Sequence, residues 1–418
     1  MTDASVTTLT PSDHTYLHLD THSSPMHWAM LLELSADGAH VQIGEVRERV
    51  RERSELFELF RLGIDRGRWR RPREVVAEKV DVDSHLTAAE YADAAELSKQ
   101  VTALLEAPLR RPQPMWHITL FTPVGDGSQY FLLRVHHAVS DGIAGAAFAA
   151  LLADGTAAEL AEFERFATSP RFRTPEIEPE VLKEAKAAFA EQHAAGKSGR
   201  NWPKLTTSGR REYALYSAST RDLRRAAKAH GASVHEFLLA AVGRAVSLAP
   251  PGSAPAEVIR VTLPVTNDPD FRHTGNAVIV TPFNLAGNES DLDRQIERCK
   301  SELAVVEKRR PELTSAAPAT EPGLPWALRR VIGSAAMKHM SPDIHIGINP
   351  GFSRARSVLG KPIIELTALS PLAGYSFSVT SLILGKRTSF GIVIDPAALP
   401  PGYADTFVEH FDRVLGEA

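Results

Sequence analysis

A short apolar run that ends in a pair of histidines is the feature that most constrains the fold of this chain. Residues 130–135 read Tyr-Phe-Leu-Leu-Arg-Val, which predicts a buried strand, and the alanine-rich residues 143–152 predict a helix packed closely on a sheet. Between them lies His136-His137-Ala138-Val139-Ser140-Asp141-Gly142. A strand, a polar loop and a helix in this order predict an α/β layer whose loop is held rigidly from behind while its side chains face a cleft.

The loop carries a candidate general base, His137. An imidazole titrates near neutral pH, so it can take a proton from a hydroxyl and return it to a leaving group. Asp141 has two roles open to it, orienting a ring nitrogen or pairing with an arginine that fixes the loop. Gly142 leaves room for a substrate or permits an unusual backbone angle. A histidine pair at a strand end is also consistent with a hydrogen-bonded polar edge that has no catalytic role.

The motif His-His-x-x-x-Asp-Gly after a strand resembles the signature of the CoA-dependent acyltransferase superfamily. That superfamily includes chloramphenicol acetyltransferase, peptide-synthetase condensation domains and the bacterial wax ester synthase/diacylglycerol acyltransferases. Further segments, in order along nearly the whole chain, resemble the last of these families. They are Leu9-Thr10-Pro11-Ser12-Asp13, Pro25-Met26-His27, Arg68-Trp69, residues 80–86, Pro108-Leu109, Pro114-Met115-Trp116, Gly275-Asn276, Asn349-Pro350-Gly351, and Phe390-Gly391 with Asp395.

The chain also departs from this family's pattern, so it resembles a divergent member. The family carries Asn-Asp at the start of a helix in the second half, where this chain has Val234-His235-Glu236-Phe237. Glu236 stands three residues after Ser233, which predicts a capping box. The segment 264–268 resembles a Pro-Val-Ser block but lacks the arginine that usually follows, and Met115 replaces the leucine of a Pro-Leu-Trp motif.

The resemblance implies an α/β (α+β) fold with two chloramphenicol-acetyltransferase-like domains and a central tunnel at their interface. The expected division is residues 1–160 for the domain that carries the motif, 161–211 for a crossover linker rich in proline and charge, and 212–418 for the second domain. In such a fold the motif loop lies near the middle of the tunnel.

The implied reaction is direct acyl transfer from an acyl-CoA co-substrate to a lipid alcohol, either diacylglycerol or a long-chain alcohol. His137 would be the base, His136 a loop-fixing residue, Asp141 an organiser and Gly142 the residue that leaves space. The oxyanion needs a donor, which is either a backbone N–H or a hydroxyl such as that of Thr380 or Ser381. No bound cofactor or metal is expected, and no cofactor-binding residues can be assigned.

Two other classes stay open. A condensation-type enzyme would take its acyl group from a carrier protein, but Ser389-Phe390-Gly391 lacks the aspartate that such enzymes often have before Phe-Gly. A non-catalytic lipid-binding protein on the same fold would not need the intact His137 and Asp141. The chain has no P-loop and no Gly-x-Ser-x-Gly motif, which disfavours ATP use and serine hydrolysis.

Composition agrees with a large globular enzyme. The 418 residues exceed what one core usually serves, and 43% hydrophobic with 23% charged residues is ordinary for a folded protein. A net charge of -4 favours no nucleic-acid partner. The single cysteine, Cys299, excludes an intramolecular disulfide and lies at helical spacing with apolar neighbours, which predicts burial. No signal peptide or long apolar span is visible, so we expect a cytoplasmic location.

Two polar clusters support weaker hypotheses. Residues 61–73 gather six arginines around Trp69, which suits a solvated hairpin or peripheral contact with anionic membranes or lipid droplets. Asp81, Asp83 and His85 contain metal-ligating groups, but the chain supplies no further ligands with suitable spacing.

Hydrophobic periodicity predicts the remaining elements. Strands are expected at 26–34, 117–121, 258–265, 277–282, 344–348, 377–384 and 389–394, and helices at 44–58, 96–105, 180–195, 221–230, after Ser233, and at 405–415.

Overall fold

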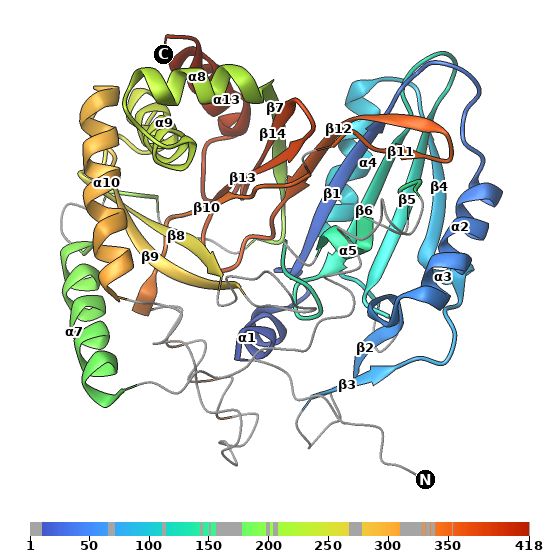
Figure 1. Ribbon diagram of the computed structural model, residues 1–418, viewed down its shortest axis with the longest axis horizontal. Coiled ribbons are helices and arrows are strands. Elements are labelled where there is room, and N and C mark those ends of the chain that lie inside the picture. The colour runs from blue at the N-terminus through green and yellow to red at the C-terminus, as the bar shows by residue number, and fades with distance from the viewer. Residues whose placement is uncertain are drawn as a thin grey trace.

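Two six-stranded sheets form two lobes that lie side by side in the computed structural model (Figure 1). The structure describes residues 11–65, 72–110, 114–142, 145–149, 152–155, 178–197, 201–203, 208–266, 278–309, 328, 331, 335, 339–352 and 354–417. The first lobe has the strand order β11-β12-β1-β6-β5-β4 and the second β7-β14-β13-β10-β8-β9. This mixed α/β architecture confirms the predicted fold class.

The first lobe is built around the strand that precedes the histidine pair. Its strands are β1 (His27–Leu34), β4 (Leu86–Tyr91), β5 (Trp116–Pro123), β6 (Tyr130–His136), β11 (Ser357–Val358) and β12 (Lys361–Leu369). Its helices are α2 (Ile43–Leu56), α3 (Val82–His85), α4 (Ala94–Glu106) and α5 (Gly145–Ala149), with the 3₁₀ turn η1 (Glu58–Arg61) and the hairpin β2 (Leu62–Asp65) and β3 (Arg73–Val76).

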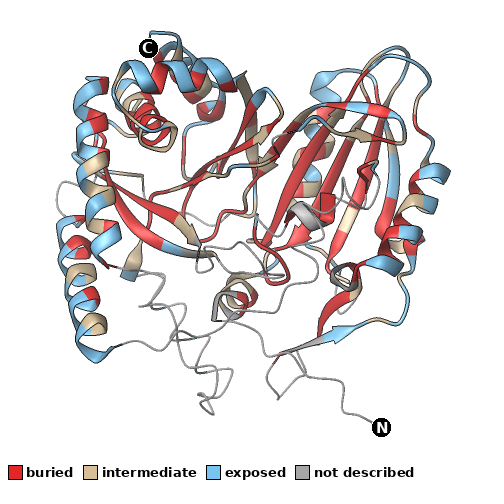
Figure 2. Ribbon diagram, viewed as in Figure 1, coloured by how far each residue is buried: buried red, intermediate tan, exposed pale blue. Residues whose placement is uncertain are grey.

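The apolar run of β6 is continuous because both of its faces are covered. Phe131, Leu133 and Val135 belong to the core that α5 and η1 help to close, whereas Leu132 belongs to the core under α4. A strand buried on both faces carries no alternation of polar and apolar residues. Figure 2 shows the central strands of both sheets as buried and the outer sides of the helices as exposed.

The second lobe contains strands β7 (Glu212–Ser219), β8 (Val258–Thr266), β9 (Val278–Ala286), β10 (Ile344–Ile348), β13 (Phe377–Leu384) and β14 (Arg387–Ile394). Its helices are α7 (Pro179–Ala195), α8 (Thr220–Ala229), α9 (Val234–Leu248), α10 (Leu292–Arg309) and α13 (Tyr403–Gly416). The predicted capping box of α9 is confirmed, because Ser233 accepts from the Glu236 N–H and Glu236 accepts from the Ser233 N–H. The helix predicted at 221–230 begins one residue earlier, at Thr220, because the residue that caps α8 is Ser219.

A strand from late in the chain completes the first sheet. β12 pairs antiparallel with β1, with Met30 opposite Ala368 and Leu31 opposite Thr367, although the predicted division assigns residues 212–418 to the second domain. The same strand packs on β13 and β14 of the second lobe. The two lobes are therefore joined through β12 as well as through the segment between β6 and β7.

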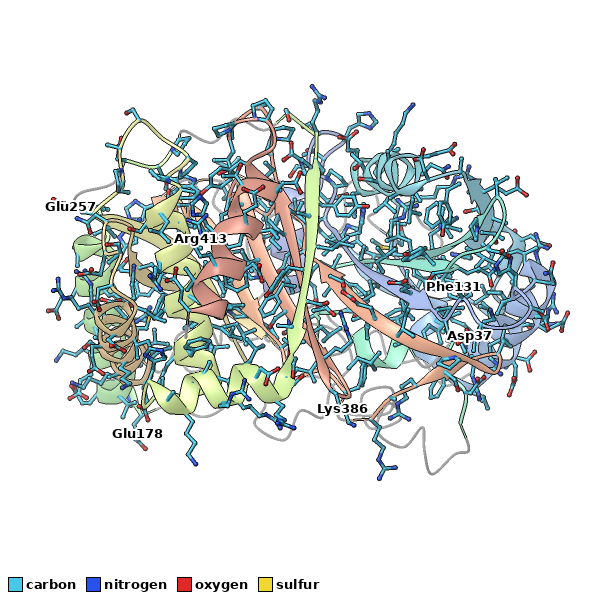
Figure 3. The ribbon with its side chains drawn as sticks, turned by 90° about the horizontal axis from the view of Figure 1, so that it is seen from above. Asp37, Phe131, Glu178, Glu257, Lys386 and Arg413 are labelled. Carbon is cyan, nitrogen blue, oxygen red and sulfur yellow. The ribbon has the colours of Figure 1, made fainter. Side chains whose placement is uncertain are left out.

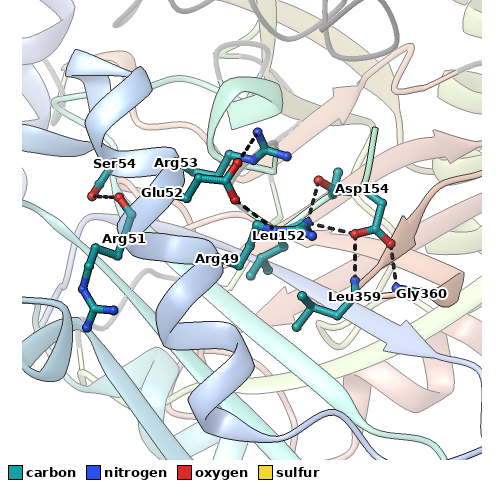
Figure 4. A network of polar contacts seen from close by, with 10 residues as sticks. Arg49, Arg51, Glu52, Arg53, Ser54, Leu152, Asp154, Leu359 and Gly360 are labelled. Atoms are coloured by element: carbon teal, nitrogen blue, oxygen red, sulfur yellow. Dashed lines mark hydrogen bonds and ion pairs between the residues drawn. The ribbon is translucent and has the colours of Figure 1, made fainter. Parts of the chain in front are cut away.

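A polar network holds the β11–β12 turn against the first lobe (Figure 4). The Asp154 carboxylate accepts from the backbone N–H groups of Leu359 and Gly360 at 2.9 and 2.8 Å, and from Arg49 of α2 at 2.9 Å. Burial acts to raise the pKa of Asp154, but these hydrogen bonds outweigh it and lower the pKa below its ordinary value.

The remaining element, α1 (Pro11–Leu19), lies at the base of the junction between the lobes in Figure 1. Seen from above, Asp37 and Glu257 mark opposite ends of the molecule (Figure 3). Among the described residues, no helix is long and apolar enough to cross a membrane.

Candidate active site

The histidine-pair loop is held by hydrogen bonds from the segments where β1 and β5 begin. The His136 N–H donates to the Met115 carbonyl and the His137 N–H donates to the Met26 carbonyl, each at 2.8 Å. The indole N–H of Trp28 donates to the Ser140 carbonyl at 2.8 Å in the buried interior. These bonds place the loop at the end of β6 with little freedom, as the sequence predicts.

The two histidines of the pair point to different surroundings. His136 is 2% exposed, its Nδ1 accepts from the Ala138 N–H at 3.0 Å, and its Nε2 lies 3.7 Å from an Asp20 carboxylate oxygen. His137 lines a cavity between the lobes. His136 is the last residue of β6 and is enclosed within the first lobe, whereas His137 lies in the turn that follows and faces the cavity.

The cavity is lined by both lobes, in the place where the family resemblance implies a central tunnel. Its lining from the first lobe, α1 and the motif loop is Tyr16, Trp28, Ala29, Met30, His137, Asp141 and Gly142. The remaining lining comes from the second lobe and from β12 with the residue after it, and consists of Pro264, Val278, Val280, His345, Gly347, Asn349, Ala368, Leu369, Ser370, Thr380 and Leu382. Tyr16, Val278 and Val280 also line a neighbouring cavity.

Tyr16 covers the face of the candidate base. The rings of Tyr16 and His137 are stacked, with centroids 3.7 Å apart and planes 10° from parallel. Burial raises the pKa of Tyr16 well above its ordinary value, and the negative charges of Asp141 and Asp13 act in the same direction. The phenol therefore stays protonated beside His137. Tyr16 was not predicted as a site residue, although it lies three residues after the N-terminal segment that resembles the family, which ends at Asp13.

Asp141 connects the loop to the second lobe. Its side chain is 1% exposed, and its Oδ2 accepts from the Val278 N–H of β9 at 3.1 Å. This bond joins the motif loop to β9 of the second lobe. Gly142 has no positive φ, and a Cβ built on it would approach only Asn349, at 4.0 Å. Its open side faces the second lobe, so of the two roles suggested for it, the structure shows the free space.

A second histidine, His345, lies in the same cavity and was missed by the sequence analysis. Its Nδ1 lies 3.1 Å from the Thr262 hydroxyl, and its ring stacks on Tyr375 at 5.2 Å. Burial, followed by the charge of His137, lowers the pKa of His345 to about 3, so its imidazole is neutral. A polar residue in the middle of the apolar strand Ile-His-Ile-Gly-Ile is the signal that could have identified it.

Two hydrogen-bond donors face this part of the cavity. The Thr380 hydroxyl is 2.7 Å from the Ser370 hydroxyl, and the Asn349 amide donates to the Ser381 carbonyl at 3.2 Å. Of the two hydroxyls considered from sequence, Thr380 lines the cavity, whereas the Ser381 hydroxyl is buried without a partner among the described residues. Asn349 also lines the cavity.

Asp83 and His85, which were considered as metal-ligating groups, point in different directions. His85 points inward and bonds the Trp116 carbonyl at 2.8 Å, whereas Asp83 is exposed and pairs with Arg47 at 2.8 Å. Within the described residues, no group of three or more histidine, cysteine or acidic side chains is arranged for a metal. The hairpin expected around the arginine cluster is confirmed as β2 and β3, but residues 66–71, which include Arg66, Trp69 and Arg71, lie outside the described residues.

A histidine-pair loop on a rigid strand end, open to a cavity between two mixed α/β lobes, defines a chloramphenicol-acetyltransferase-like protein of two fused lobes. Solved structures agree. The fold matches the wax ester synthase/diacylglycerol acyltransferase from Marinobacter aquaeolei VT8 with a TM-score of 0.66 and 20% identity over 98% of each chain. It also matches the first condensation domain of the calcium-dependent antibiotic synthetase with a TM-score of 0.64 and 16% identity over 99% of this chain and 96% of that one.

Sequence comparison is more specific. Residues 9–196 match the model of the wax ester synthase/diacylglycerol acyltransferase catalytic domain. A curated Mycobacterium tuberculosis protein, named "putative diacylglycerol O-acyltransferase" in strain H37Rv, is 26% identical over 411 residues, which cover 83% of this chain and 79% of the relative. The chain is thus similar to the wax ester synthase/diacylglycerol acyltransferase family over residues 9–196, and to the Mycobacterium tuberculosis relative over most of its length.

Proposed function

We propose that this protein is an acyl-CoA-dependent O-acyltransferase that transfers a fatty acyl group to a lipid alcohol, with His137 as general base. The observation that carries the proposal is the placement of His137 at the cavity between the lobes, on a loop whose backbone is fixed by Met26, Met115 and Trp28. A base must be held within hydrogen-bonding reach of the proton it removes, and this support restricts its position.

The proposed reaction needs one base, His137, and hydrogen-bond donors for the oxyanion. His137 takes the proton of the acceptor hydroxyl as its oxygen attacks the thioester carbonyl carbon. The C–O bond forms, the carbonyl electrons move to oxygen, and the resulting oxyanion requires hydrogen bonds. The Thr380 hydroxyl and the Asn349 amide are the candidate donors. When the intermediate collapses, the C–S bond breaks and protonated His137 returns its proton to the CoA sulfur.

The neighbouring residues act through His137. Tyr16 stacks on the imidazole and restricts its rotation. Asp141 joins the loop to β9 and so sets the distance between the base and the second-lobe donors. His136 and Asp20 fix the loop within the first lobe. Gly142 keeps the space toward Asn349 open. No bound cofactor or metal is part of the proposal, and acyl-CoA is a co-substrate.

The acceptor is proposed from chemistry and family. Trp28, Met30, Leu369 and Leu382 give the cavity an apolar wall that suits an acyl chain or a long-chain alcohol. Relatives whose names include diacylglycerol acyltransferase or wax ester synthase support the two acceptor classes, diacylglycerol and a long-chain alcohol. We further propose that a cytoplasmic protein with such substrates reaches them by peripheral contact with a membrane or a lipid droplet.

The test is transfer of the labelled acyl group of palmitoyl-CoA to a panel of alcohols by wild type and His137→Ala. Loss of a general base commonly lowers the rate by about a hundredfold to ten-thousandfold. We expect a loss in this range with an unchanged unfolding midpoint, and full activity in the control His22→Ala, because His22 lies at an exposed turn. Wild-type turnover by His137→Ala would refute the assignment of the base.

The condensation-domain likeness gives a second candidate, since that fold match is nearly as strong. In that case the acyl donor would be a carrier-protein thioester. Comparing palmitoyl-CoA with a palmitoylated carrier protein under the same conditions separates the two, because a condensation-type enzyme would transfer only from the carrier. Absence of transfer from both donors, with lipid still bound, would favour a lipid-binding protein.

A further inference from the structure

A separate cavity at one end of the first lobe's sheet contains a buried cation that has no acidic partner among the described residues. The cavity measures about 330 Å³ and lies where β4, β5 and β6 meet the end of α4. Arg110, His117 and Arg134 are among the residues that line it, and none of its lining residues is shared with the cavity at His137. The proposed reaction makes no use of it.

Arg134 is the buried cation that lines this cavity. The residue is 5% exposed, and its Nη1 donates to the carbonyls of Leu104 and Ala107 at the end of α4, at 2.7 and 3.0 Å. Its Nε is buried without a hydrogen-bond partner among the described residues. Burial lowers the pKa of Arg134 to about 10, and no acidic group opposes this effect. Within the described structure, the guanidinium charge is thus compensated only by the partial negative charge of a helix end.

The groups around Arg134 add the positive charge of Arg110 and an unused hydrogen-bonding nitrogen on His117. His117 stands opposite Arg134 in the register of β5 and β6, and its Nδ1 is buried without a partner in the described structure. Burial, and then the charges of Arg134, His85 and Arg110, lower the pKa of His117 to about 4. The acidic lining residue, Asp83, is 77% exposed and already pairs with Arg47.

We propose that this cavity is a binding site for a phosphate monoester, whose negative charge is the missing counterion of Arg134. A buried charge that lacks a partner is costly, so an anion that enters gains from pairing with it. The planar guanidinium suits two oxygens of a phosphate, and Arg110 and Thr87 at the rim reach the same space. The cavity is much larger than the roughly 30 Å³ share of one water, so it also admits part of the group that carries the phosphate.

Inorganic phosphate is the first probe, with binding measured by isothermal titration calorimetry on the full chain. We expect Arg134→Met to lose binding and Arg134→Lys to weaken it roughly tenfold, the scale of one charge-assisted hydrogen bond. Because Arg134 also caps α4, its substitution can affect folding. Arg110→Gln keeps the test valid, since Arg110 is exposed, and should weaken binding severalfold. The matched control is Arg224→Gln on α8, an equal change of charge in the other lobe.

Equal affinity of Arg110→Gln, Arg224→Gln and wild type, or no binding of phosphate by wild type, would overturn the proposal and leave a cavity filled by water. Coenzyme A and dephospho-coenzyme A then identify the source of the phosphate. A preference for coenzyme A that Arg134→Lys reduces assigns the site to the 3′-phosphate of the acyl donor, whereas equal affinities assign it to a separate small phosphate. His137→Ala should retain this binding, so failure of the proposed acyl transfer would not be confused with failure of this site.

Discussion

We expect Gly391→Ala to be severely destabilising, because β12 passes so close to β14 that there is no space for a side chain at Gly391. Gly391 lies in the middle of β14, and a Cβ built on it would lie 2.1 Å from the Ala368 carbonyl oxygen and 2.8 Å from a Leu369 methyl carbon. Ordinary contact distances exceed these values by about an ångström or more. The strands would have to separate, because the nearest atom is backbone and cannot rotate away.

The cost follows from what opposes that separation. Ala368 pairs with Met30 in the ladder of β12 and β1, so displacing it strains a buried sheet. An added methyl in a packed core costs typically 1–3 kcal/mol, and a weakened ladder hydrogen bond adds roughly 1 kcal/mol. We therefore expect the free energy of unfolding to fall by about 3 kcal/mol. Activity should fall as well, because Ala368, Leu369 and Ser370 line the cavity at His137.

Urea unfolding followed by tryptophan fluorescence measures the loss, with acyl transfer assayed on the same samples. Gly44→Ala is the control, since a Cβ at Gly44 in α2 meets nothing within 4 Å. That variant should unfold at the wild-type urea concentration or slightly above it, because alanine favours a helix more than glycine does. If Gly391→Ala unfolds together with Gly44→Ala, the close approach of β12 to β14 does not limit this fold.

Three further predictions follow. Asp141→Asn should lower the free energy of unfolding by about 2 kcal/mol through its bond to the Val278 N–H, as well as reduce turnover; full stability with a rate loss as large as that of His137→Ala would point to direct catalysis. The folded-state pKa values of His117 and His345, about 4 and about 3, lie below the ordinary 6.5. As the pH falls, these two histidines therefore bind protons in the unfolded chain before they do so in the folded chain. Stability should therefore fall as pH drops below 6.5, by on the order of 2 kcal/mol per histidine near pH 5, and equal urea midpoints at neutral pH and near pH 5 would contradict this. Replacing Arg66, Arg68, Arg70 and Arg71 with glutamine should weaken co-sedimentation with anionic liposomes at low salt, at about 1 kcal/mol per basic group, and spare transfer to a soluble alcohol; unchanged binding at both low and high salt would show a merely solvated face.

Local patterns in the sequence were sufficient for several elements of the fold. The apolar run before His136 predicted β6, and the Ser233–Glu236 pair predicted the start of α9, because both signals depend on neighbours within a few residues. The helix α7 and its end at Gly196 were predicted for the same reason. The motif with His137 indicated both the loop and the family resemblance, since its residues lie within seven consecutive positions.

Other elements escaped because their partners are distant in the chain. β4, β7 and β12 were not predicted, and β12 joins a sheet whose other long strands end by residue 136. The burial pattern of β12 depends on two distant partners. β1 pairs with one of its edges, and β13 and β14 cover one of its faces. Such pairing depends on which surfaces meet in the folded protein, and a short stretch of sequence does not show which distant segment will be its partner.

The candidate site divides in the same way. The sequence by itself determined that a histidine, an aspartate and a glycine stand together on a loop after a buried strand, because they are consecutive and the strand is apolar. Only the tertiary structure decided that Tyr16 stacks on His137, that Asp141 bonds β9, and that His345 enters the same cavity. Tyr16 and His345 lie more than a hundred residues from the motif, and they reach it because β12 and Asp141 hold the two lobes together around the space between them.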